Sequence, residues 1–207
     1  MFYLLKLYLN GTLKFTDRYK DKWKSKFLKM ITKLIIVGKG ASGKDFLKHK
    51  LKDIGMITSV SYTTRPPRKD EINGIHYHYI KECEFLNMVK NNEFIEWNKF
   101  ANKWYYGTTK KHFNLANLFI MTPSGIRALS DKERSESLII YLDISEEVRV
   151  KRLLNRKDND DYMRRIKTDD FDFKEFVDFD LHITDHNFTI NDITSKILDV
   201  CPHLIKK

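Results

Sequence analysis

The chain has 207 residues, of which 42% are hydrophobic and 13% aromatic, and its formal net charge is +10. This composition excludes a disordered tail, and a content of only 8 glycines and 4 prolines excludes a collagen-like chain. Apolar runs fall short of the ~18 residues of a membrane helix, so we expect no membrane partner. Two distant cysteines, Cys83 and Cys201, indicate neither a disulfide framework nor a zinc ribbon, and favour a cytoplasmic location.

The positive charge is concentrated near the N-terminus. Residues 1–29 contain eight Lys or Arg and two Asp, which account for most of the excess. A nucleic-acid-binding domain usually spreads its basic surface more widely, so we expect no nucleic-acid partner. We interpret residues 1–29 as an apolar and basic extension that need not belong to the fold.

A glycine-rich loop follows the first apolar run. Lys33–Val37 predicts a buried strand, and Phe46–Lys52 predicts a helix. Between them lies G-x-x-x-x-G-K, whose glycines allow backbone N–H groups to surround phosphate oxygens. The motif predicts nucleotide binding, with Lys44 reaching the β and γ phosphates. The predicted nucleotide-binding residues are Gly38, Lys39, Gly40, Ala41, Ser42, Gly43, Lys44 and Asp45.

Asp45 departs from this motif, because a Ser or Thr normally follows the lysine and ligates Mg²⁺. A carboxylate is a hard oxygen ligand that can hold Mg²⁺ directly. We therefore predict Mg²⁺ as cofactor and Asp45 as its ligand. The alternative is a broken metal site.

Strands and helices alternate along the rest of the chain, except over residues 59–114. Further strands are predicted at Asn117–Met121, Leu138–Leu142 and Leu181–Thr184, and helices at 145–154 and from Thr189 to about 200. This alternation predicts an α/β fold, a three-layer parallel sheet with helices on both faces. We assign 30–58 and 115–207 to this core. Residues 59–114, with strand-like runs Ile75–Ile80 and Phe94–Phe100, predict an inserted, mostly β subdomain.

Several motifs in this subdomain carry a specific resemblance. SYTTRPPR (61–68), NGIHY (73–77), EFIEW (93–97) and YYGT (105–108) follow the glycine-rich loop in that order. Over about residues 33–200 the chain resembles the guanylate kinase family. The resemblance implies ATP-dependent phosphorylation of GMP or dGMP by a P-loop core, a GMP-binding subdomain over 59–114 and a helical lid at about 156–170. It also implies that the nucleotide of the glycine-rich loop is ATP and that Lys44 is a catalytic residue, and it leaves open a monomer or a homodimer.

The resemblance also implies individual roles. The GMP phosphate would be held by Ser61, Arg65, Arg68, Tyr77 and Tyr106. Glu96 would accept from guanine N1–H and N2–H, and Thr108 would contact guanine O6. Adenine offers no such pair of donors, so a buried acid penalises AMP. Arg156 and Arg165 would approach the transferred phosphoryl group, and Thr184 and Asp185 would contact the adenine of ATP.

The chain lacks the aspartate pair that typically follows the second core strand in the family. Ile120, Met121, Thr122, Pro123, Ser124 and Gly125 stand there instead. One interpretation is that the metal-binding carboxylate has moved to Asp45. The competing interpretation is a catalytically silent module that binds a partner protein. For the activity itself, a kinase with a broader deoxynucleotide range is a further alternative.

Overall fold

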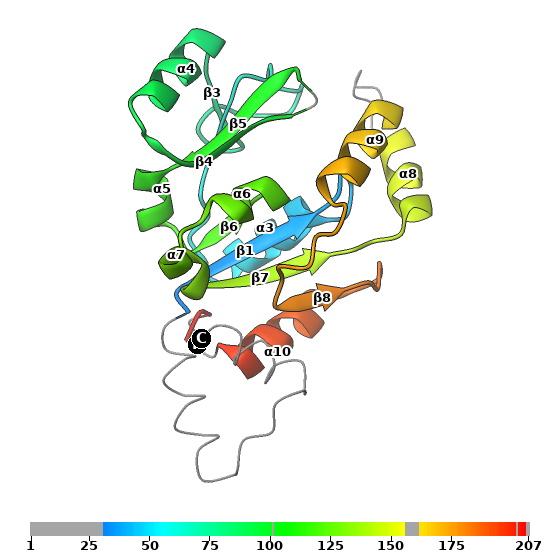
Figure 1. Ribbon diagram of the computed structural model, residues 1–207. Coiled ribbons are helices and arrows are strands. Elements are labelled where there is room, and N and C mark those ends of the chain that lie inside the picture. Colours follow the sequence, from blue (N-terminus) through cyan, green and yellow to red (C-terminus); the bar gives the residue numbers. More distant parts are fainter. Residues whose placement is uncertain (1–30, 101, 156–161, 202, 206–207) are drawn as a thin grey trace.

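Two separate β-sheets organise the computed structural model, which describes residues 31–100, 102–155, 162–201 and 203–205 (Figure 1). The first sheet is parallel and has the strand order β6-β1-β7-β8. Its strands are β1 (Lys33–Gly38), β6 (Leu118–Ile120), β7 (Ser137–Leu142) and β8 (Leu181–Ile183). The predicted extension over residues 1–29 lies outside the described residues.

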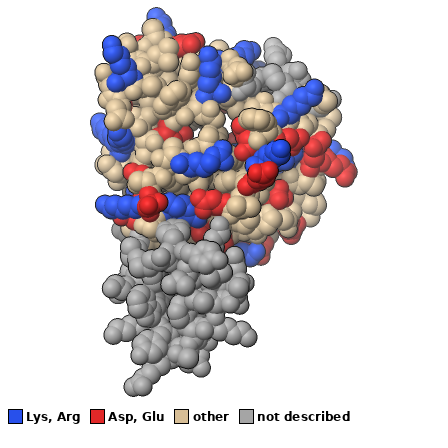
Figure 2. Space-filling model, viewed as in Figure 1, with Lys and Arg blue, Asp and Glu red and all other residues tan. Residues whose placement is uncertain are grey.

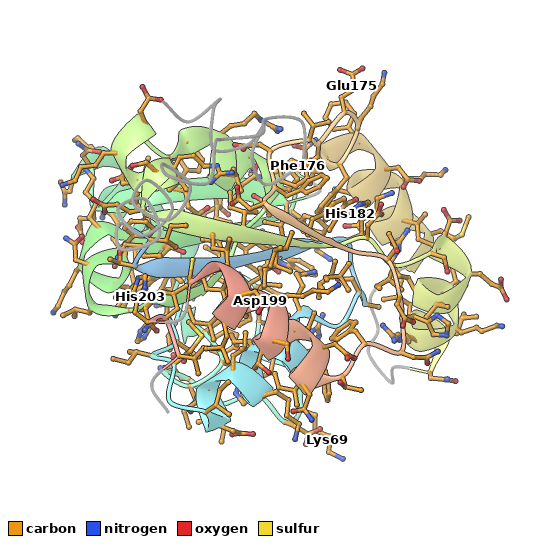
Figure 3. All side chains as sticks on the ribbon, turned by 90° about the horizontal axis from the view of Figure 1, so that it is seen from below. Lys69, Glu175, Phe176, His182, Asp199 and His203 are labelled. Atoms are coloured by element: carbon orange, nitrogen blue, oxygen red, sulfur yellow. The ribbon has the colours of Figure 1, made fainter. Side chains whose placement is uncertain are left out.

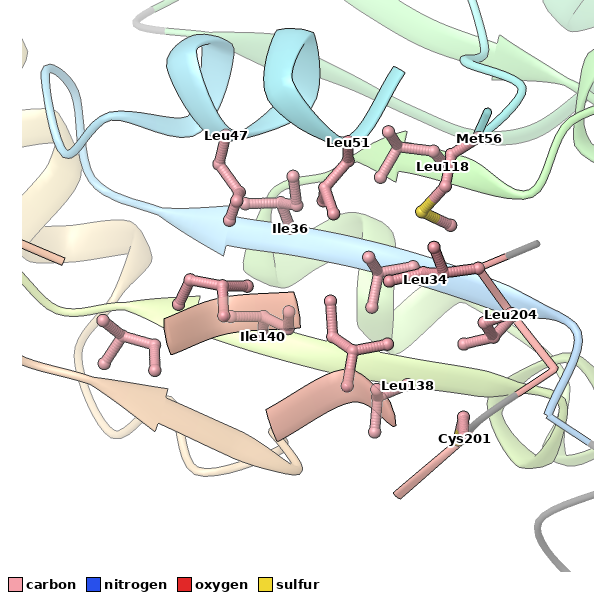
Figure 4. Close-up of a cluster of buried hydrophobic side chains, with 14 of the residues drawn as sticks. Leu34, Ile36, Leu47, Leu51, Met56, Leu118, Leu138, Ile140, Cys201 and Leu204 are labelled. Atoms are coloured by element: carbon pink, nitrogen blue, oxygen red, sulfur yellow. The ribbon is translucent and has the colours of Figure 1, made fainter. Parts of the chain in front are cut away.

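The central strands of this sheet are buried along their whole length, in accordance with their unbroken apolar sequences. Two hydrophobic clusters cover its faces. Helices α3 (Lys44–Asp53) and α10 (Ile190–Val200) pack on one face through residues such as Leu47, Leu51 and Ile197 (Figure 4). Helices α5 (Lys110–Leu115) and α6 (Pro123–Ala128) cover the other face. The predicted fold class is therefore confirmed.

The second sheet is mixed and has the order β3-β2-β5-β4. Its strands are β2 (Tyr62–Thr63), β3 (His78–Tyr79), β4 (Phe94–Phe100) and β5 (Trp104–Thr109), with helix α4 (Glu82–Lys90) beside them. The strand-like run over 75–80 is shorter than expected, because Gly74, at φ 78°, forms a turn in which its N–H donates to the Tyr77 carbonyl. Domain boundaries remain a prediction.

Helix ends follow local chemistry closely. Helix α3 begins at Lys44, two residues earlier than predicted, because Gly43 adopts φ 104° and turns the chain directly into the helix. Thr189, where the last helix is predicted to begin, is the N-cap of α10: its side chain accepts from Asp192 N, and the Asp192 carboxylate accepts from Thr189 N. The remaining helices are α7 (Asp131–Ser135), α8 (Glu146–Leu154) and α9 (Tyr162–Asp172).

The phenylalanine-rich run after α9 packs against the parallel sheet. Phe173, Phe176 and Phe179 surround the ring of Tyr141, with centroid distances of 5.4–5.5 Å. Figure 3 shows Phe176 and His182 on this side of the molecule, and His203 near the start of β1. His203 Nε2 lies 2.6 Å from the Ile31 carbonyl oxygen, which joins the C-terminal segment to the beginning of β1.

The described surface carries charges of both signs. On the face shown in Figure 2, basic and acidic side chains are interspersed and do not form a patch of one sign. Among the described helices, none has the length and apolar character needed to cross a membrane. Cys83 is exposed, Cys201 is buried, and both are free thiols.

Candidate functional site

The glycine-rich loop closes at the carboxyl end of β1. A side chain at Gly38 would lie 2.6 Å from Ser42 Oγ and 2.8 Å from the Leu142 carbonyl oxygen, so the close approach requires glycine. Lys44 Nζ donates to the carbonyls of Gly38 at 2.6 Å and Lys39 at 2.9 Å. The lysine therefore lies across the loop in which phosphate oxygens are expected.

A carboxylate from another helix lies on this loop. Asp169 of α9 accepts a hydrogen bond from Gly40 N at 2.7 Å, and only 6% of its surface is exposed. Arg149, which is fully buried on α8, lies 3.4 Å from the same carboxylate oxygen. Lys39 forms a second link to α9 through Asp170, at 2.8 Å. Burial raises the pKa of Asp169, although the Gly40 N–H opposes this shift.

Asp45 borders two cavities beside the loop. One contains the loop residues Ala41 to Phe46 together with Arg152 and the segment 186–188; the other contains Arg68 and Tyr77. The Asp45 carboxylate is exposed, so a hydrated cation can reach it from solvent without burial of the charged group. In the part of the chain that the structure describes, no three or more His, Cys, Asp and Glu side chains form a ready-made metal cluster.

A central pocket connects the loop to the second sheet. Gly38, Gly40 and Lys44 of the loop line this pocket together with predicted GMP-binding residues. The GMP-binding residues in its wall are Ser61, Arg68, Tyr77, Glu96 and Tyr106. Residues from two sheets thus meet around one cavity, which places a candidate donor site beside a candidate acceptor site.

The predicted phosphate ligands form a layered cluster. Arg65 is buried behind the pocket wall, where its Nη2 lies 2.8 and 2.7 Å from the two carboxylate oxygens of Glu71. The guanidinium carbon lies 5.6 Å from the centre of the Tyr77 ring, and the ring centres of Tyr77 and Tyr106 are 5.9 Å apart. Arg68 is more exposed and borders the pocket directly. This arrangement provides positive charge and phenolic donors for a phosphate.

Burial and nearby charges change the acidity of this cluster. Burial raises the pKa of Tyr77 well above its usual range, and the Asp45 carboxylate acts in the same direction. Burial also raises the pKa of Tyr106, although Arg65 opposes the shift. Both phenols therefore keep their protons at neutral pH and can donate to a phosphate oxygen.

Glu96 lines the same pocket as Arg68, Tyr77 and Tyr106. It is 8% exposed, and burial raises its pKa to about 7 against the opposing effect of hydrogen bonds from Thr108. Thr108 is behind the wall, and its hydroxyl lies 3.2 Å from Ser61 Oγ. A buried carboxylate beside two hydroxyls is suited to a base edge that presents adjacent N–H donors.

A chain of hydrogen-bonded polar side chains occupies the segment where the family's aspartates are missing. Asn98 Nδ2 donates to Ser124 Oγ at 3.0 Å, and Ser124 Oγ lies 2.8 Å from Thr122 Oγ1. Thr122 caps α6 by accepting from Gly125 N. A side chain at Gly125 would come within 3.0 Å of Glu96 Oε2, so the start of this helix approaches the buried carboxylate closely.

Some predicted residues cannot be placed in the site. Arg156 lies outside the described residues, and Arg165 lies on α9 without a described side chain. Thr184 and Asp185 do not border the cavity beside the loop, whereas the next three residues do. Asp185 accepts a hydrogen bond from Asn187 N. Arg152 reaches this cavity and donates to the carbonyls of Ala41 and His186.

Sequence reasoning missed the buried partners of the site. Glu71 follows the arginine loop by three residues, a spacing that could have indicated an ion pair with Arg68. Asp169 and Asp172 are three residues apart on α9 and both border the pocket, but their sequence reads as an acidic surface. Nothing in the sequence indicated that Asn98 and Ser124 are paired.

Comparisons with known proteins agree on one family. The family model described as guanylate kinase matches residues 30–201. A guanylate kinase of Rickettsia bellii (strain RML369-C) is 33% identical over 177 residues, which are 80% of this chain and 92% of that protein. Another, of Prochlorococcus marinus subsp. pastoris, is 30% identical over 187 residues, 84% of this chain and 98% of that protein.

The fold has a counterpart among solved structures. A crystal structure of guanylate kinase from Anaplasma phagocytophilum aligns with a TM-score of 0.64 over 87% of this chain and 90% of that one. The two sequences are 21% identical in this alignment. This likeness shows the two-sheet architecture.

Proposed function

Because this chain belongs to the guanylate kinase family, we propose that it transfers the terminal phosphoryl group of ATP to GMP or dGMP. The observation that carries this proposal is that Lys44 and Gly40 of the glycine-rich loop line the same pocket as the buried Glu96. Arg68 and Tyr77 lie in its wall, where an acceptor phosphate would face the glycine-rich loop.

The proposed reaction is one in-line displacement. An oxygen of the GMP phosphate attacks the terminal phosphorus of ATP, the bond to the bridging oxygen breaks, and ADP leaves with that oxygen. Phosphoryl transfer requires positioning and neutralised charge more than covalent help. Lys44 would hold the donor phosphates, while Arg68 and the two tyrosines would hold the acceptor. Arg65 would add positive charge from behind the pocket wall. Arg156 and Arg165 remain candidates for the transferred group.

Glu96 would provide selectivity for guanine. As a carboxylate it can accept from N1–H and N2–H together, whereas adenine would leave the buried charge unpaired. Ser61 lines the pocket and lies 3.2 Å from Thr108 Oγ1, so it would meet the base edge rather than the phosphate, with Thr108 behind it. The proposal thus requires that Glu96 ionise when guanine binds.

The residues around the loop fit a magnesium ion. Asp45 would hold it through an exposed carboxylate oxygen next to the catalytic lysine, and Mg²⁺ commonly uses one or two carboxylates together with substrate phosphates. When bound, the ion would neutralise charge on the donor phosphates. Positions 120 and 122 hold Ile and Thr instead of acids, so Asp45 is the carboxylate within the loop that could take over metal binding.

The test is release of ADP from ATP and Mg²⁺ with GMP, dGMP, AMP, UMP and dTMP as separate acceptors. Turnover confined to GMP and dGMP is the expected result. Turnover with several bases would instead support a broad deoxynucleotide kinase. If folded protein shows no turnover with any acceptor, the silent binding module becomes the better account.

A further inference from the structure

We infer that Asn98 contacts the ribose of the acceptor nucleotide and favours GMP over dGMP. This inference rests on the proposed function and adds a specificity-determining residue to it. Asn98 borders the central pocket on the same strand as Glu96, two residues further along. Side chains two residues apart in a strand point to the same face, so both face the pocket.

The register of the strand pair places Asn98 at the level of the sugar. In the β4–β5 ladder, Glu96 is opposite Thr108 and Asn98 is opposite Tyr106. In the proposed binding mode, the first pair marks the base end of the pocket and Tyr106 the phosphate end. Two residues of strand span roughly 6.6 Å, about the separation of a base edge from its ribose. An acceptor bound between these ends therefore passes its ribose beside Asn98.

The Asn98 side chain is held in place by its Nδ2, which leaves its Oδ1 to accept a further hydrogen bond. Its Nδ2 donates to Ser124 Oγ of helix α6. Among the described residues, the structure gives no hydrogen bond to its Oδ1. A ribose 2′-hydroxyl is a donor that this carbonyl oxygen can accept, and a deoxyribose has no such donor.

The test compares kcat/KM for GMP and dGMP in the wild type, Asn98→Ala and Ser124→Ala. Asn98→Ala is expected to lower kcat/KM for GMP about fivefold, the value of one neutral hydrogen bond, and to leave dGMP unchanged. Ser124→Ala releases the amide and is expected to give a smaller loss in the same direction. An equal effect on both nucleotides would show a structural role and overturn the inference.

Calorimetric titration with GMP and dGMP separates this inference from the proposed function. If the wild type phosphorylates neither nucleotide but Asn98→Ala selectively weakens GMP binding, the sugar contact is supported and the kinase proposal is disproved. If the wild type phosphorylates both nucleotides, and Asn98→Ala changes neither the GMP-to-dGMP ratio of kcat/KM nor that of Kd, the sugar contact is disproved and the kinase proposal is retained.

A different observation carries a second inference: a carboxylate of the chain itself accepts from an N–H of the glycine-rich loop. We propose that Asp169 competes with nucleotide phosphate for this loop. Its carboxylate already uses the Gly40 N–H at 2.7 Å, and its oxygen lies 3.0 Å from the position that a Gly40 Cβ would take. A phosphate cannot use the same N–H until this carboxylate leaves.

The contact also connects the loop to helix α9. Arg149 holds Asp169 from behind at 3.4 Å, and the Lys39–Asp170 pair adds an outer link. Since Asp169 belongs to α9, its release requires that helix to move relative to the loop. Donor binding is thereby coupled to the position of the helix that also carries Arg165.

The test measures the Kd of ATP by calorimetry in the wild type, Asp169→Asn and Asp170→Ala, with Mg²⁺ and separately with EDTA. Asp169→Asn is expected to tighten ATP binding about tenfold in both conditions, because a charge-assisted hydrogen bond no longer has to be exchanged. Asp170→Ala, a control at an exposed residue, should change the Kd of ATP less. The Gly40 amide should exchange its hydrogen faster in Asp169→Asn.

Two results would overturn this second inference. Unchanged ATP affinity in Asp169→Asn, with the protein folded by circular dichroism, would show that the carboxylate offers no competition. Weaker binding confined to the Mg²⁺ condition would identify Asp169 as a metal ligand instead. Neither result depends on phosphoryl transfer, so failure of the kinase proposal would be seen separately.

Discussion

Glu71 holds Arg65 through both of its carboxylate oxygens, at 2.8 and 2.7 Å from one guanidinium nitrogen. The same carboxylate accepts from the Tyr79 hydroxyl and from Arg68 N. Both members of the pair are largely buried, at 6% and 14% side-chain exposure. Glu71 therefore fixes the arginine loop from behind, while the front of the cluster faces the pocket.

Replacing Glu71 by Gln should weaken acceptor binding. The substitution leaves the Arg65 charge buried without its partner, and this costs roughly 3 kcal/mol of unfolding free energy. We expect KM for GMP to rise at least tenfold with a smaller change in kcat, measured by steady-state kinetics. Glu82→Gln, at an exposed position on α4, is the matched control. An unchanged KM in a folded Glu71→Gln protein would contradict this role.

The pKa of Glu96 gives a signed prediction for pH. Burial raises this pKa from 4.5 to about 7, so the folded protein retains the proton to higher pH than the unfolded chain. The resulting stabilisation is complete below pH 4.5 and is lost as pH rises through 7, by at most about 3 kcal/mol. Urea unfolding without nucleotide between pH 5 and 8 measures this loss, which Glu96→Gln should remove.

Guanine recognition should show the opposite dependence on pH. Because guanine requires the carboxylate, kcat/KM for GMP should rise as pH increases through the Glu96 pKa. Glu96→Gln should lower kcat/KM for GMP by about a hundredfold, since one of its two donors would face a guanine N–H. A flat wild-type profile from pH 5.5 to 8 would exclude Glu96 as the group that ionises.

The architecture follows from the sequence more fully than the site does. Continuous apolar runs such as Lys33–Val37 predict central parallel strands because helices cover both faces of such strands. The glycine-rich loop and Glu96 are local signals. Glu71, Asp169 and Asn98 act through partners brought close by the tertiary fold, and Asn98 reaches Ser124 from 26 residues away in the chain. Periodicity cannot predict such contacts, and a run of acids gives no sign that one of them is buried.

Asp45 is expected to determine the dependence on magnesium. Asp45→Ala should raise the Mg²⁺ concentration for half-maximal activity about tenfold, because one charged oxygen ligand is lost. Calorimetry should also show a smaller effect of Mg²⁺ on ATP binding than in the wild type. Asp53→Ala, at the exposed end of the same helix, is the control. Wild-type turnover and magnesium dependence in Asp45→Ala would disprove the assignment.

The core of the parallel sheet should be sensitive to cavities. Leu138 is fully buried in the cluster shared by α3 and α10. Leu138→Ala should lower the free energy of unfolding by about 2–5 kcal/mol in urea titration. Phe171→Ala, at a side chain that is 80% exposed, should change it by less than about 0.5 kcal/mol. Equal effects of the two substitutions would contradict the described packing.

The central claim is that this chain converts GMP to GDP through the pocket that joins Lys44 to Glu96. The most direct measurement is chromatographic separation of nucleotides after incubation of the full chain with ATP, Mg²⁺ and GMP at pH 8. The account predicts GDP and ADP in equal amounts, with no product from AMP and almost none from the Glu96→Gln protein. ADP without GDP, or no product from folded wild-type protein, would contradict it.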